Sequence, residues 1–547
     1  MKKFLALAVL TGMFLSGCGS SADDPILGGP LRVNTLRVVD STPDLAVNGQ
    51  SVTLGRVTGF DSGGNVVFGP DEEIYDEEMV FTGLPLETTE VEVEYLRAQG
   101  FTLASHRQSV NFVNDDDGVI TLNEVQPGFL SATPATLTVR VENLSDYDPS
   151  EIFVTVLGKD KADTAFYYLQ LGNNDNNSMQ LFGPKADFAK YSFALSSTVK
   201  EEGQNAYSFS CPYDKLVSGR IYLSFGQKLE GLGLNNPADL KSLSTPSPTG
   251  APDYQKVFEF MELSATIQDN PGAEYILFAN TSVVDFFSLG LGMTLNYHSN
   301  NNNLTERVGF VDNARALVLQ AFDAPGVPSE FKSYITDPSN GKIIRVLAPV
   351  QTVAVNSNGP TANFLNSAID AGWTLYSQQV LNLPDNLSFS YGYQYTGQLI
   401  VNNILSMTTV ATPPGDNASL NEVCNLPKPT TRIIFFCDDD MPPANTPDKD
   451  TWKNAGTDGH KRLCSLLSSA INRGVFENYS DWDDPTKFYT RPDGRYNHYS
   501  KIMHQFALDK KVYGFGYDDV YGQDPTLSEP VSTVNQVVLQ IPAIQKI

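Results

Sequence analysis

The sequence predicts a multidomain, mainly β protein that becomes mixed α/β towards its C-terminus. Its 547 residues exceed the size of one ordinary domain. Early in the chain, short runs of alternating apolar residues recur between turns rich in Gly, Asp and Asn, which is the period-two pattern of β-strands. Later, apolar residues recur at the spacing of amphipathic helices. We therefore expect a small β-sandwich followed by a larger domain with a β-rich part and a mixed α/β part.

The N-terminus has the features of an export signal. Residues 1–3 are Met-Lys-Lys, and the apolar run that follows ends at Leu15 and is too short to span a bilayer. The next three residues end on Cys18, so the stretch resembles the lipobox of bacterial lipoproteins, and this resemblance implies lipidation of Cys18. We expect a signal peptide over 1–17 and a lipid-anchored linker over 18–30. The alternative is an ordinary signal peptide with a stray cysteine.

Such a leader predicts an exported protein held at the cell envelope, at the outer membrane or the cell surface. The net charge of -26 and the pI near 4.5 argue against nucleic acid or anionic lipid as the main partner. We therefore expect membrane contact through the lipid anchor only. A neutral polymer is compatible with this charge. The 24 Tyr and 31 Phe would suit stacking on sugars, although β-rich cores need a similar content.

The cysteines and histidines do not have the spacing of a metal site. The cysteines beyond Cys18 are Cys211, Cys424, Cys437 and Cys464. Disulfides are permitted in an oxidising compartment, but the sequence alone leaves the pairing open. No close Cys/His pair has zinc-finger spacing, so we expect no cofactor and no catalytic metal. His498 and His504 are expected to be packing residues of a helix.

The domain boundaries follow from changes in pattern. Residues 31–128 are expected to form an immunoglobulin-like β-sandwich, and residues 132–547 a second domain that is β-rich over about 132–290 and mixed α/β over about 291–547. Strand patterns occupy 31–39, 51–57, 91–95, 119–125, 135–141, 152–157 and 221–225. Helical spacing occupies 311–322, 361–373, 460–474 and 496–509.

Two neighbouring stretches carry the most informative acidic residues. Residues 258–264 and 278–287 are expected to be strands. In the first, Glu262 shares a face with two phenylalanines, whereas Glu259 points to the opposite face because side chains alternate. If the strands are neighbours, Glu262 and Asp285 can face one cleft, and two carboxylates that flank a glycosidic bond are the minimal apparatus for its hydrolysis. The alternative is that both are solvated surface groups.

These stretches resemble those of glycoside hydrolase family 64, the laminaripentaose-producing β-1,3-glucanases. That family has an aromatic-x-aromatic-x-Glu-aromatic-Thr stretch and then an Asn-Ser/Thr-Thr-x-Val-Asp-x-Phe stretch, and residues 258–264 and 280–287 fit this layout. Further matching pieces, in the same order, are 154–158, 218–229, 345–349, 497–499 with His504, and 513–520. The resemblance spans roughly 132–545. It implies a thaumatin-like β-barrel joined to a mixed α/β subdomain, with a wide groove between them.

The resemblance also implies roles for individual residues. By position, Glu262 corresponds to the general acid and Asp285 to the general base of the family. The positions that correspond to sugar-contacting residues are Ser264, Phe278, Asn280 and Ser282. Several residues depart from the family pattern: Leu263 replaces an aromatic residue, Ser264 and Ser282 each replace Thr, and Phe278 replaces Trp. The serines keep a hydroxyl and the phenylalanine keeps a stacking face.

Three further expectations concern the end of the chain and the surroundings of the acid. The resemblance favours a place in the cleft for one of Asp518 and Asp519. Cys437 and Cys464 match a family cysteine pair, which implies a disulfide. Because Glu262 follows two phenylalanines, we expect an apolar surround that favours its protonated form.

The sequence thus favours a monomeric enzyme that hydrolyses β-1,3-glucan of the laminarin or curdlan type with inversion and releases short oligosaccharides. Inversion requires two carboxyl groups with room for a water molecule between them and the sugar. The alternative is a surface β-glucan-binding lipoprotein without turnover, because a fold does not imply a function. A structural envelope protein is a third interpretation.

Overall fold

The structure, a computed structural model, describes residues 35–123 and 136–547 apart from internal gaps. The gaps are 40–45, 48–49, 52–53, 63–65, 75–77, 83, 86–87, 98–100, 110–118, 161–164, 173–176, 182–188, 231–252, 268–274, 300–301, 384–391, 401–402 and 437–457. The predicted signal peptide, the linker with Cys18, and Cys437 therefore lie outside the described residues. The chain divides into two compact units, residues 1–132 and 133–547, and each is described by itself.

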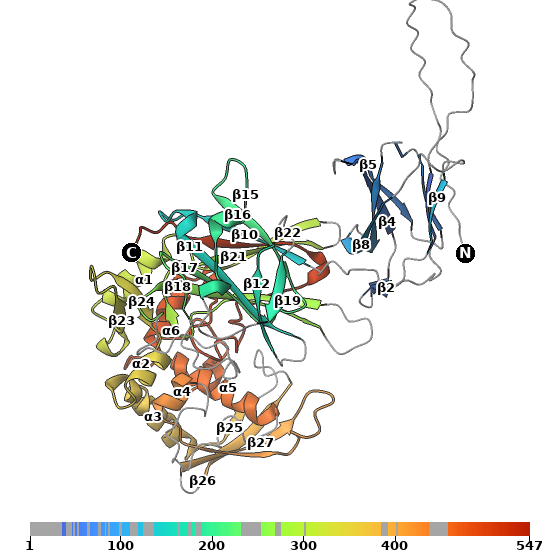
Figure 1. Cartoon of the computed structure of the whole chain (residues 1–547). Coiled ribbons are helices and arrows are strands. Elements are labelled where there is room, and N and C mark those ends of the chain that lie inside the picture. The colour runs from blue at the N-terminus through green and yellow to red at the C-terminus, as the bar shows by residue number, and fades with distance from the viewer. Residues whose placement is uncertain are drawn as a thin grey trace, which may run out of the picture. The chain divides into compact units, whose positions relative to one another are not determined.

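The N-terminal unit is built of short strands. They are β1 (Thr35–Val39), β2 (Ala46–Val47), β3 (Gln50–Ser51), β4 (Leu54–Phe60), β5 (Val66–Ile74), β6 (Glu78–Thr82), β7 (Glu90–Arg97), β8 (Phe101–Ser109) and β9 (Val119–Asn123). They form sheets of order β6-β1-β9, β5-β4-β7-β8 and β2-β3 (Figure 1). Val57, Phe81 and Val93 are buried, as alternation along the strands requires. The expected strands are confirmed, whereas the immunoglobulin-like topology stays a prediction.

The second unit contains two large sheets. The first has the order β15-β16-β10-β30-β21-β22, and the second has the order β13-β12-β11-β17-β18-β19-β29 with β14 paired to β11. Their strands are β10 (Thr136–Asn143), β11 (Ile152–Lys159), β12 (Phe166–Gln170), β13 (Ser178–Leu181), β14 (Phe193–Ala194), β15 (Val199–Lys200), β16 (Ala206–Pro212), β17 (Val217–Phe225), β18 (Val257–Ile267), β19 (Tyr275–Thr281), β21 (Gly292–Ser299), β22 (Asn302–Gly309), β29 (Leu527–Pro530) and β30 (Val534–Ile541).

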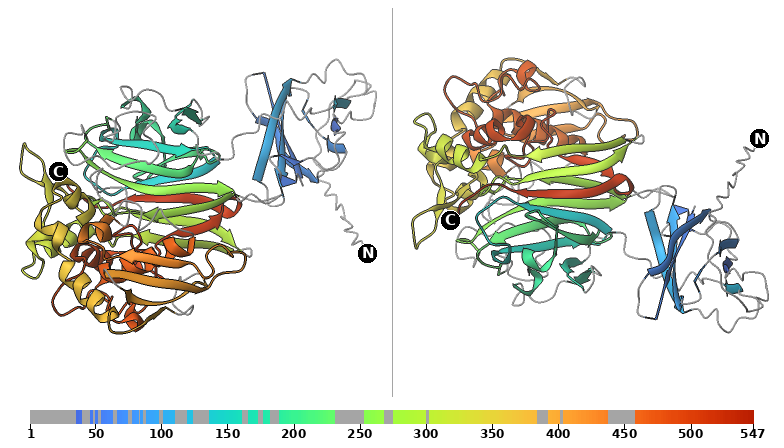
Figure 2. Two further views of the ribbon diagram at one scale, coloured as in Figure 1. Left: turned by 90° about the horizontal axis from the view of Figure 1, so that it is seen from below. Right: turned by 90° about the horizontal axis from the view of Figure 1, so that it is seen from above.

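One hydrophobic core joins these two sheets. Every second residue of β10 is buried, including Val139 and Val141, because side chains alternate across the strand. Val154 and Val156 of β11 enter the same cluster from the other sheet. Burying each such side chain contributes about 1.5–3 kcal/mol. Figure 2 shows the strands of the β-rich part in layers, with the yellow and orange helical segments gathered to one side. Closure of the sheets into a barrel stays a prediction.

The predicted internal division near residue 290 is wrong. Strands β21, β22, β29 and β30 all follow that position, yet they belong to the two large sheets. Strand β30 even lies at the centre of the first sheet, paired with β10 in parallel and with β21 antiparallel. The chain leaves the β-rich part after β22 and returns at β29, so the helical part is an insertion. Sequence order cannot reveal this, because a strand's neighbours in space need not be its neighbours in the chain.

The inserted part is mixed α/β, as predicted. Its helices are α1 (Ala314–Asp323), α2 (Pro349–Val355), α3 (Asn366–Tyr376), α4 (Thr431–Phe436), α5 (Asp458–Arg473) and α6 (His498–Phe506). Its strands, with β20 (Phe286–Phe287) just before it, are β23 (Tyr334–Thr336), β24 (Ile343–Leu347), β25 (Leu381–Leu383), β26 (Gln394–Ile400), β27 (Ile404–Ala411) and β28 (Val423–Pro427). They form sheets of order β20-β24-β23 and β25-β26-β27-β28. Within the described parts of the chain, no helix is both long enough and apolar enough to cross a bilayer.

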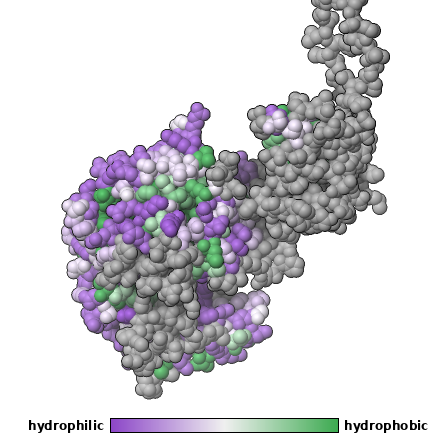
Figure 3. Space-filling view, viewed as in Figure 1, coloured by the Kyte–Doolittle hydropathy of each residue, from purple (hydrophilic) through white to green (hydrophobic). Residues whose placement is uncertain are grey.

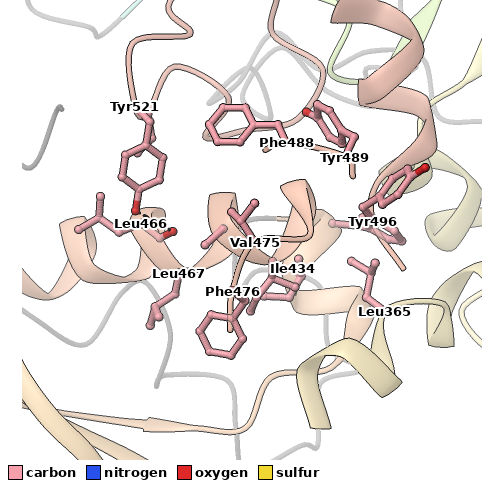
Figure 4. Close-up of a cluster of buried hydrophobic side chains, with 14 of the residues drawn as sticks. Leu365, Ile434, Leu466, Leu467, Val475, Phe476, Phe488, Tyr489, Tyr496 and Tyr521 are labelled. Atoms are coloured by element: carbon pink, nitrogen blue, oxygen red, sulfur yellow. Dashed lines mark hydrogen bonds between the residues drawn. The ribbon is translucent and has the colours of Figure 1, made fainter. Parts of the chain in front are cut away.

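A second hydrophobic core holds the inserted part together. Phe476 follows α5 and stacks between Trp482 and Trp373, with ring centroids 5.9 and 5.4 Å away. Figure 4 shows Phe476 beside Leu467 of α5 and Ile434 of α4, with the tyrosines of the following loop above them. Because the rings interlock, this region has little room for additional atoms.

We predict that Gly372→Ala destabilises the protein, although alanine is the better helix former. A Cβ atom at this buried position on α3 would overlap the ring of Phe476. The gain in helix propensity is about 1 kcal/mol, whereas overpacking costs about 1–3 kcal/mol, so the free energy of unfolding should fall. Urea denaturation measures it. The control is Gly326→Ala, whose Cβ would meet nothing within 4 Å. Equal stability of both variants would contradict the prediction.

Candidate active site

Strand register brings the predicted acid onto a half-exposed face of the second large sheet. Arg220 of β17 pairs with Glu262 of β18, which in turn pairs with Asn280 of β19. Cross-strand partners point to the same side of a sheet, so the three side chains are neighbours. Glu262 is half-buried, whereas Met261 and Leu263 on either side of it are fully buried. The predicted face of Glu262 and the pairing of the two strands are therefore confirmed.

The same face continues with groups that suit a sugar. Ser264 lies opposite Phe278 in the register, and the Phe278 side chain is 39% exposed. The hydroxyl of Ser264 accepts a hydrogen bond of 2.9 Å from the backbone N–H of Ser218. An exposed aromatic ring with hydroxyl and amide groups beside it provides both a stacking face and hydrogen-bonding partners for a saccharide.

Asp285 reaches the site by a different route from the one the sequence predicts. Strand β19 ends at Thr281, and Ser282 forms an isolated parallel bridge with Tyr513, so residues 278–287 are not one continuous strand. Asp285 lies in the turn before β20 and is half-buried. The amide of Gln351 donates a 2.7 Å hydrogen bond to its Oδ1 atom. The orientation of this carboxylate is thus set by a turn and by α2, and strand alternation does not set it.

Arg220 connects the two carboxylates electrostatically. Its guanidinium donates to Glu262 Oε1 at 3.1 Å and lies 4.7 Å from the centre of the Phe260 ring. Burial lowers the pKa of Arg220, but its interactions with Tyr222, Glu262 and Asp285 raise it, and the net shift is upward. Both acids are therefore close enough to interact with this cation. The expected apolar surround of Glu262 is wrong in this respect, because the neighbouring strand supplies a charge.

Glu259, the rival acid, has a structural role. It is 2% exposed and lies on the opposite face from Glu262, as predicted. Its carboxylate accepts hydrogen bonds from the backbone N–H groups of Ser288, Leu289 and Gly290, at 3.3, 3.0 and 2.9 Å. Burial raises the pKa of Glu259, although these backbone donors oppose the shift. Glu259 thus fixes the backbone that follows β20.

The two polar residues at the end of β19 are buried. Asn280 is 7% and Ser282 is 6% exposed. The Oδ1 atom of Asn280 has no hydrogen-bond partner among the described residues. Buried polar atoms are normally satisfied by protein, water or a ligand, so this amide oxygen is an unused acceptor that is closed to solvent. The structure therefore brings Glu262, Ser264, Phe278 and Asn280 together, and buried Ser282 follows directly after β19.

Asp518 is a correction to the predicted sugar contacts. Its side chain is completely buried, and its carboxylate pairs with Arg473 and His504, each at 2.8 Å. It also accepts from Ser500 at 3.0 Å and from the Gly514 N–H at 2.9 Å. The sequence pattern could not separate it from Asp519, which is half-buried and whose pKa is raised by burial and by nearby Asp524.

Both late histidines are packing residues, as predicted. His498 is 5% exposed and contacts the Gly494 carbonyl at 2.9 Å, and burial lowers its pKa to about 4. His504 is held between Asp518 and the Lys510 carbonyl. Among the cysteines, Cys464 is buried on α5, but Cys437 lies outside the described residues, so their disulfide stays a prediction.

Sequence reasoning missed two groups of the site. Arg220 lies within the matching stretch 218–229. Alternation of side chains along β17 would have indicated that it faces the same side of the sheet as Glu262. Gln351 offered no signal, because it is 66 residues from Asp285 in the chain and meets it only through the fold. Both are polar side chains that position a carboxylate.

The surface around the second unit is mainly hydrophilic. On the face shown in Figure 3, purple residues dominate and hydrophobic positions form small separate patches. The wide groove stays a prediction. An open pocket of about 460 Å³ follows α5 and is lined by Glu477 and Arg491, among others, and Glu262 is not part of its lining.

Two carboxylates that share an arginine on a sheet face, beside an exposed aromatic ring, define a polysaccharide-hydrolase type of site. The sequence matches the glycoside hydrolase family 64 profile, described as β-1,3-glucanase, over residues 135–541. The chain therefore belongs to this family and is a glycoside hydrolase of the β-1,3-glucanase class. Among curated proteins, none matches the sequence significantly.

Solved structures support the same fold. A β-1,3-glucanase domain (GH64) from Clostridium beijerinckii is 20% identical, with 75% of this chain and 98% of that chain covered and a TM-score of 0.56. A laminaripentaose-producing β-1,3-glucanase in complex with laminaritetraose is 18% identical, with 75% and 99% covered and a TM-score of 0.55. At these identities the likeness shows the fold alone.

We predict that Asp518→Asn destabilises the protein by about 3–5 kcal/mol, because it leaves buried Arg473 without its counter-charge. Burial raises the pKa of Asp518, but His504 and Arg473 hold it below the usual range. A carboxylate with a lowered pKa stabilises the fold above its unfolded pKa of about 4, and this contribution is lost as pH falls through the folded value. The difference in the free energy of unfolding between wild type and variant, measured by urea denaturation, should therefore become smaller as the pH falls. Asp519→Asn is the control, and a pH-independent difference would contradict the account.

Proposed function

We propose that the chain hydrolyses β-1,3-glucan of the laminarin or curdlan type by an inverting single displacement and releases short oligosaccharides. The observation that carries this proposal is the register of β17, β18 and β19, which lines up Arg220, Glu262 and Asn280 on one half-exposed face. Asp285 interacts with the same arginine. The family match over residues 135–541, described as β-1,3-glucanase, supports a β-1,3-linked chain as the substrate.

In this proposal Glu262 is the general acid and Asp285 is the general base. Glu262 would donate its proton to the leaving glycosidic oxygen while Asp285 takes a proton from a water that attacks the anomeric carbon from the opposite side. Gln351 would hold the base in position through its hydrogen bond to Oδ1. Arg220 would moderate the repulsion between the two carboxylates, since it interacts electrostatically with both. No covalent intermediate forms in this sequence of events.

The remaining residues of the face would bind the sugar chain. Phe278 offers an exposed stacking surface, and Ser264 lies directly across the strand pair from it. Asn280 would contact the sugar chain through a water bound to its Oδ1 atom, because that atom is unpartnered and closed to solvent. Ser282, which is 6% exposed, and half-buried Asp519 would line the edge of the sugar-binding face. The protein would act as a monomer without a cofactor.

The alternative function is glucan binding without turnover. The observations that favour it are the departures from the family pattern around the acid, where Leu263 replaces an aromatic residue and Ser264 a threonine. Leu263 is fully buried on the opposite face from Glu262, so its replacement changes the core and leaves the sugar-facing surface intact. This favours the hydrolase over the binding protein.

We predict that Glu262→Gln and Asp285→Asn each lower kcat on laminarin by about 10²- to 10⁴-fold, because each removes one proton-transfer group. Glucan affinity, measured by calorimetry with each inactive variant, should persist. Glu529→Gln is the matched control, since Glu529 pairs with Leu277 and therefore faces the other side of the same sheet. Full activity of the Glu262→Gln variant would show that Glu262 is not part of the active site. If wild type binds laminarin but creates no new reducing ends, the binding protein is the correct alternative.

We also propose that the protein is exported and anchored to the envelope by a lipid on Cys18. The support is the lipobox-like stretch that ends at this residue. Cys18→Ser should abolish labelling by radioactive palmitate and release the protein from the membrane fraction, because only the thiol accepts the diacylglycerol. Cys211→Ser, a buried thiol elsewhere, is the control. A variant at Cys18 that still labels and sediments with membranes would show that the anchor lies elsewhere.

A further inference from the structure

Three potential metal ligands meet where β28 contacts the start of α5. One ligand atom each from Glu422, Cys424 and His460 lies within 4.8 Å of the other two. Cys424 is fully buried and His460 is 6% exposed, while Glu422 is half-buried at the edge of the group. This cluster lies in the inserted part and has no residue in common with the candidate active site.

The backbone around this cluster is fixed by hydrogen bonds. Thr409 of β27 receives a bond from the Asn421 N–H and donates its own N–H to the Glu422 carbonyl, both at 2.9 Å. Tyr395 of β26 donates to the Gly459 carbonyl at 2.7 Å, directly before His460. The Gly459 N–H in turn donates to Ser419 at 3.0 Å. The sheet and the helix are therefore held at a defined distance, and the three ligands project from supported positions.

We propose that Glu422, Cys424 and His460 form a structural zinc site. A thiolate, an imidazole and a carboxylate are the ligand types that Zn²⁺ combines, with bonds of about 2.0–2.3 Å, so ligand atoms in one coordination shell lie about 3–4 Å apart. The three ligand atoms, which lie within 4.8 Å of one another, would move closer together on binding. Glu422 directly precedes β28, and Cys424 is the second residue of that strand. A ligand atom of each lies within 4.8 Å of one from His460.

The fourth position of the tetrahedron belongs to water or to Cys464. Cys464 follows His460 by one turn of α5 and is buried, so both side chains lie on one helix face. The group whose ligand atoms lie within 4.8 Å of one another does not include Cys464, so its sulfur would have to move to bind the ion. If Cys464 forms the expected disulfide with Cys437, water completes the site.

Zinc binding would replace the thiol proton of Cys424. Without a metal ion, a buried thiol carries its proton at neutral pH. The S–H bond breaks, its proton leaves to solvent and a Zn–S bond forms, with no change of oxidation state. The ion would join β28 to the start of α5, whose other end carries Arg473. The site therefore stabilises the inserted part, and it does not depend on the proposed hydrolysis.

The test uses the full mature chain, purified under reducing conditions, stripped by a chelator and reloaded with Zn²⁺ or Co²⁺. We expect about one tightly bound zinc per chain by mass spectrometry, a rise of Tm on loading, and a thiolate-to-cobalt charge-transfer band with Co²⁺. Cys424→Ser should lose the band. Glu422→Gln is an isosteric change at a half-buried position, so the variant should fold. It should weaken zinc binding about 100-fold or more, because the loss of even an outer-shell partner lowers metal affinity by about 10- to 100-fold. Cys211→Ser should behave as wild type.

Three results would overturn the proposal. The first is zinc binding far below one equivalent by a wild-type chain whose circular dichroism shows it to be folded. The second is an unchanged cobalt band in Cys424→Ser. The third is a Cys424 disulfide, found by peptide mapping of protein isolated from the cell envelope without reductant, since a disulfide sulfur cannot serve as a thiolate ligand.

Discussion

The hydrogen-bond register of β17, β18 and β19 is the constraint on which the proposed chemistry depends. Side chains alternate along a strand, so a slip of one residue would exchange Glu262 for buried Met261 or Leu263 and turn the acid into the core. The core itself prevents that slip, because Met261, Leu263 and Ala265 together fill the space between the two large sheets. The free energy gained by burying these apolar side chains thus fixes the position of the Glu262 carboxylate.

The second carboxylate depends on the inserted part of the fold. The chain from Val283 to Asp285 is held by the backbone of Tyr513, which accepts the Val283 N–H at 3.0 Å, and by Tyr499, whose hydroxyl donates to the Val283 carbonyl at 2.7 Å. Buried Asp518 organises the segment that carries Tyr513. Damage to that ion-pair network would therefore affect the position of Asp285 through the backbone, although the Asp518 side chain is fully buried.

The sequence predicted what depends on local pattern and missed what depends on pairing over long separations. Strand alternation placed Glu262 and Glu259 on opposite faces, and helical spacing found α5 and α6. The return of β30 to the centre of a sheet was missed, because no local sequence pattern indicates that β30 pairs with β10. The same limit applies to Gln351, to the burial of Asp518 and to the Glu422, Cys424 and His460 cluster, whose residues lie too far apart in the chain to form a spacing motif.

The stereochemistry of the first product tests the central claim most directly. Proton NMR during early laminarin hydrolysis distinguishes the two anomers of the new reducing end before they equilibrate. If Asp285 activates water for a single displacement, the product released from a β-linkage is the α-anomer. Initial release of the β-anomer would mean a covalent intermediate on the enzyme, and it would contradict the roles assigned to Glu262 and Asp285.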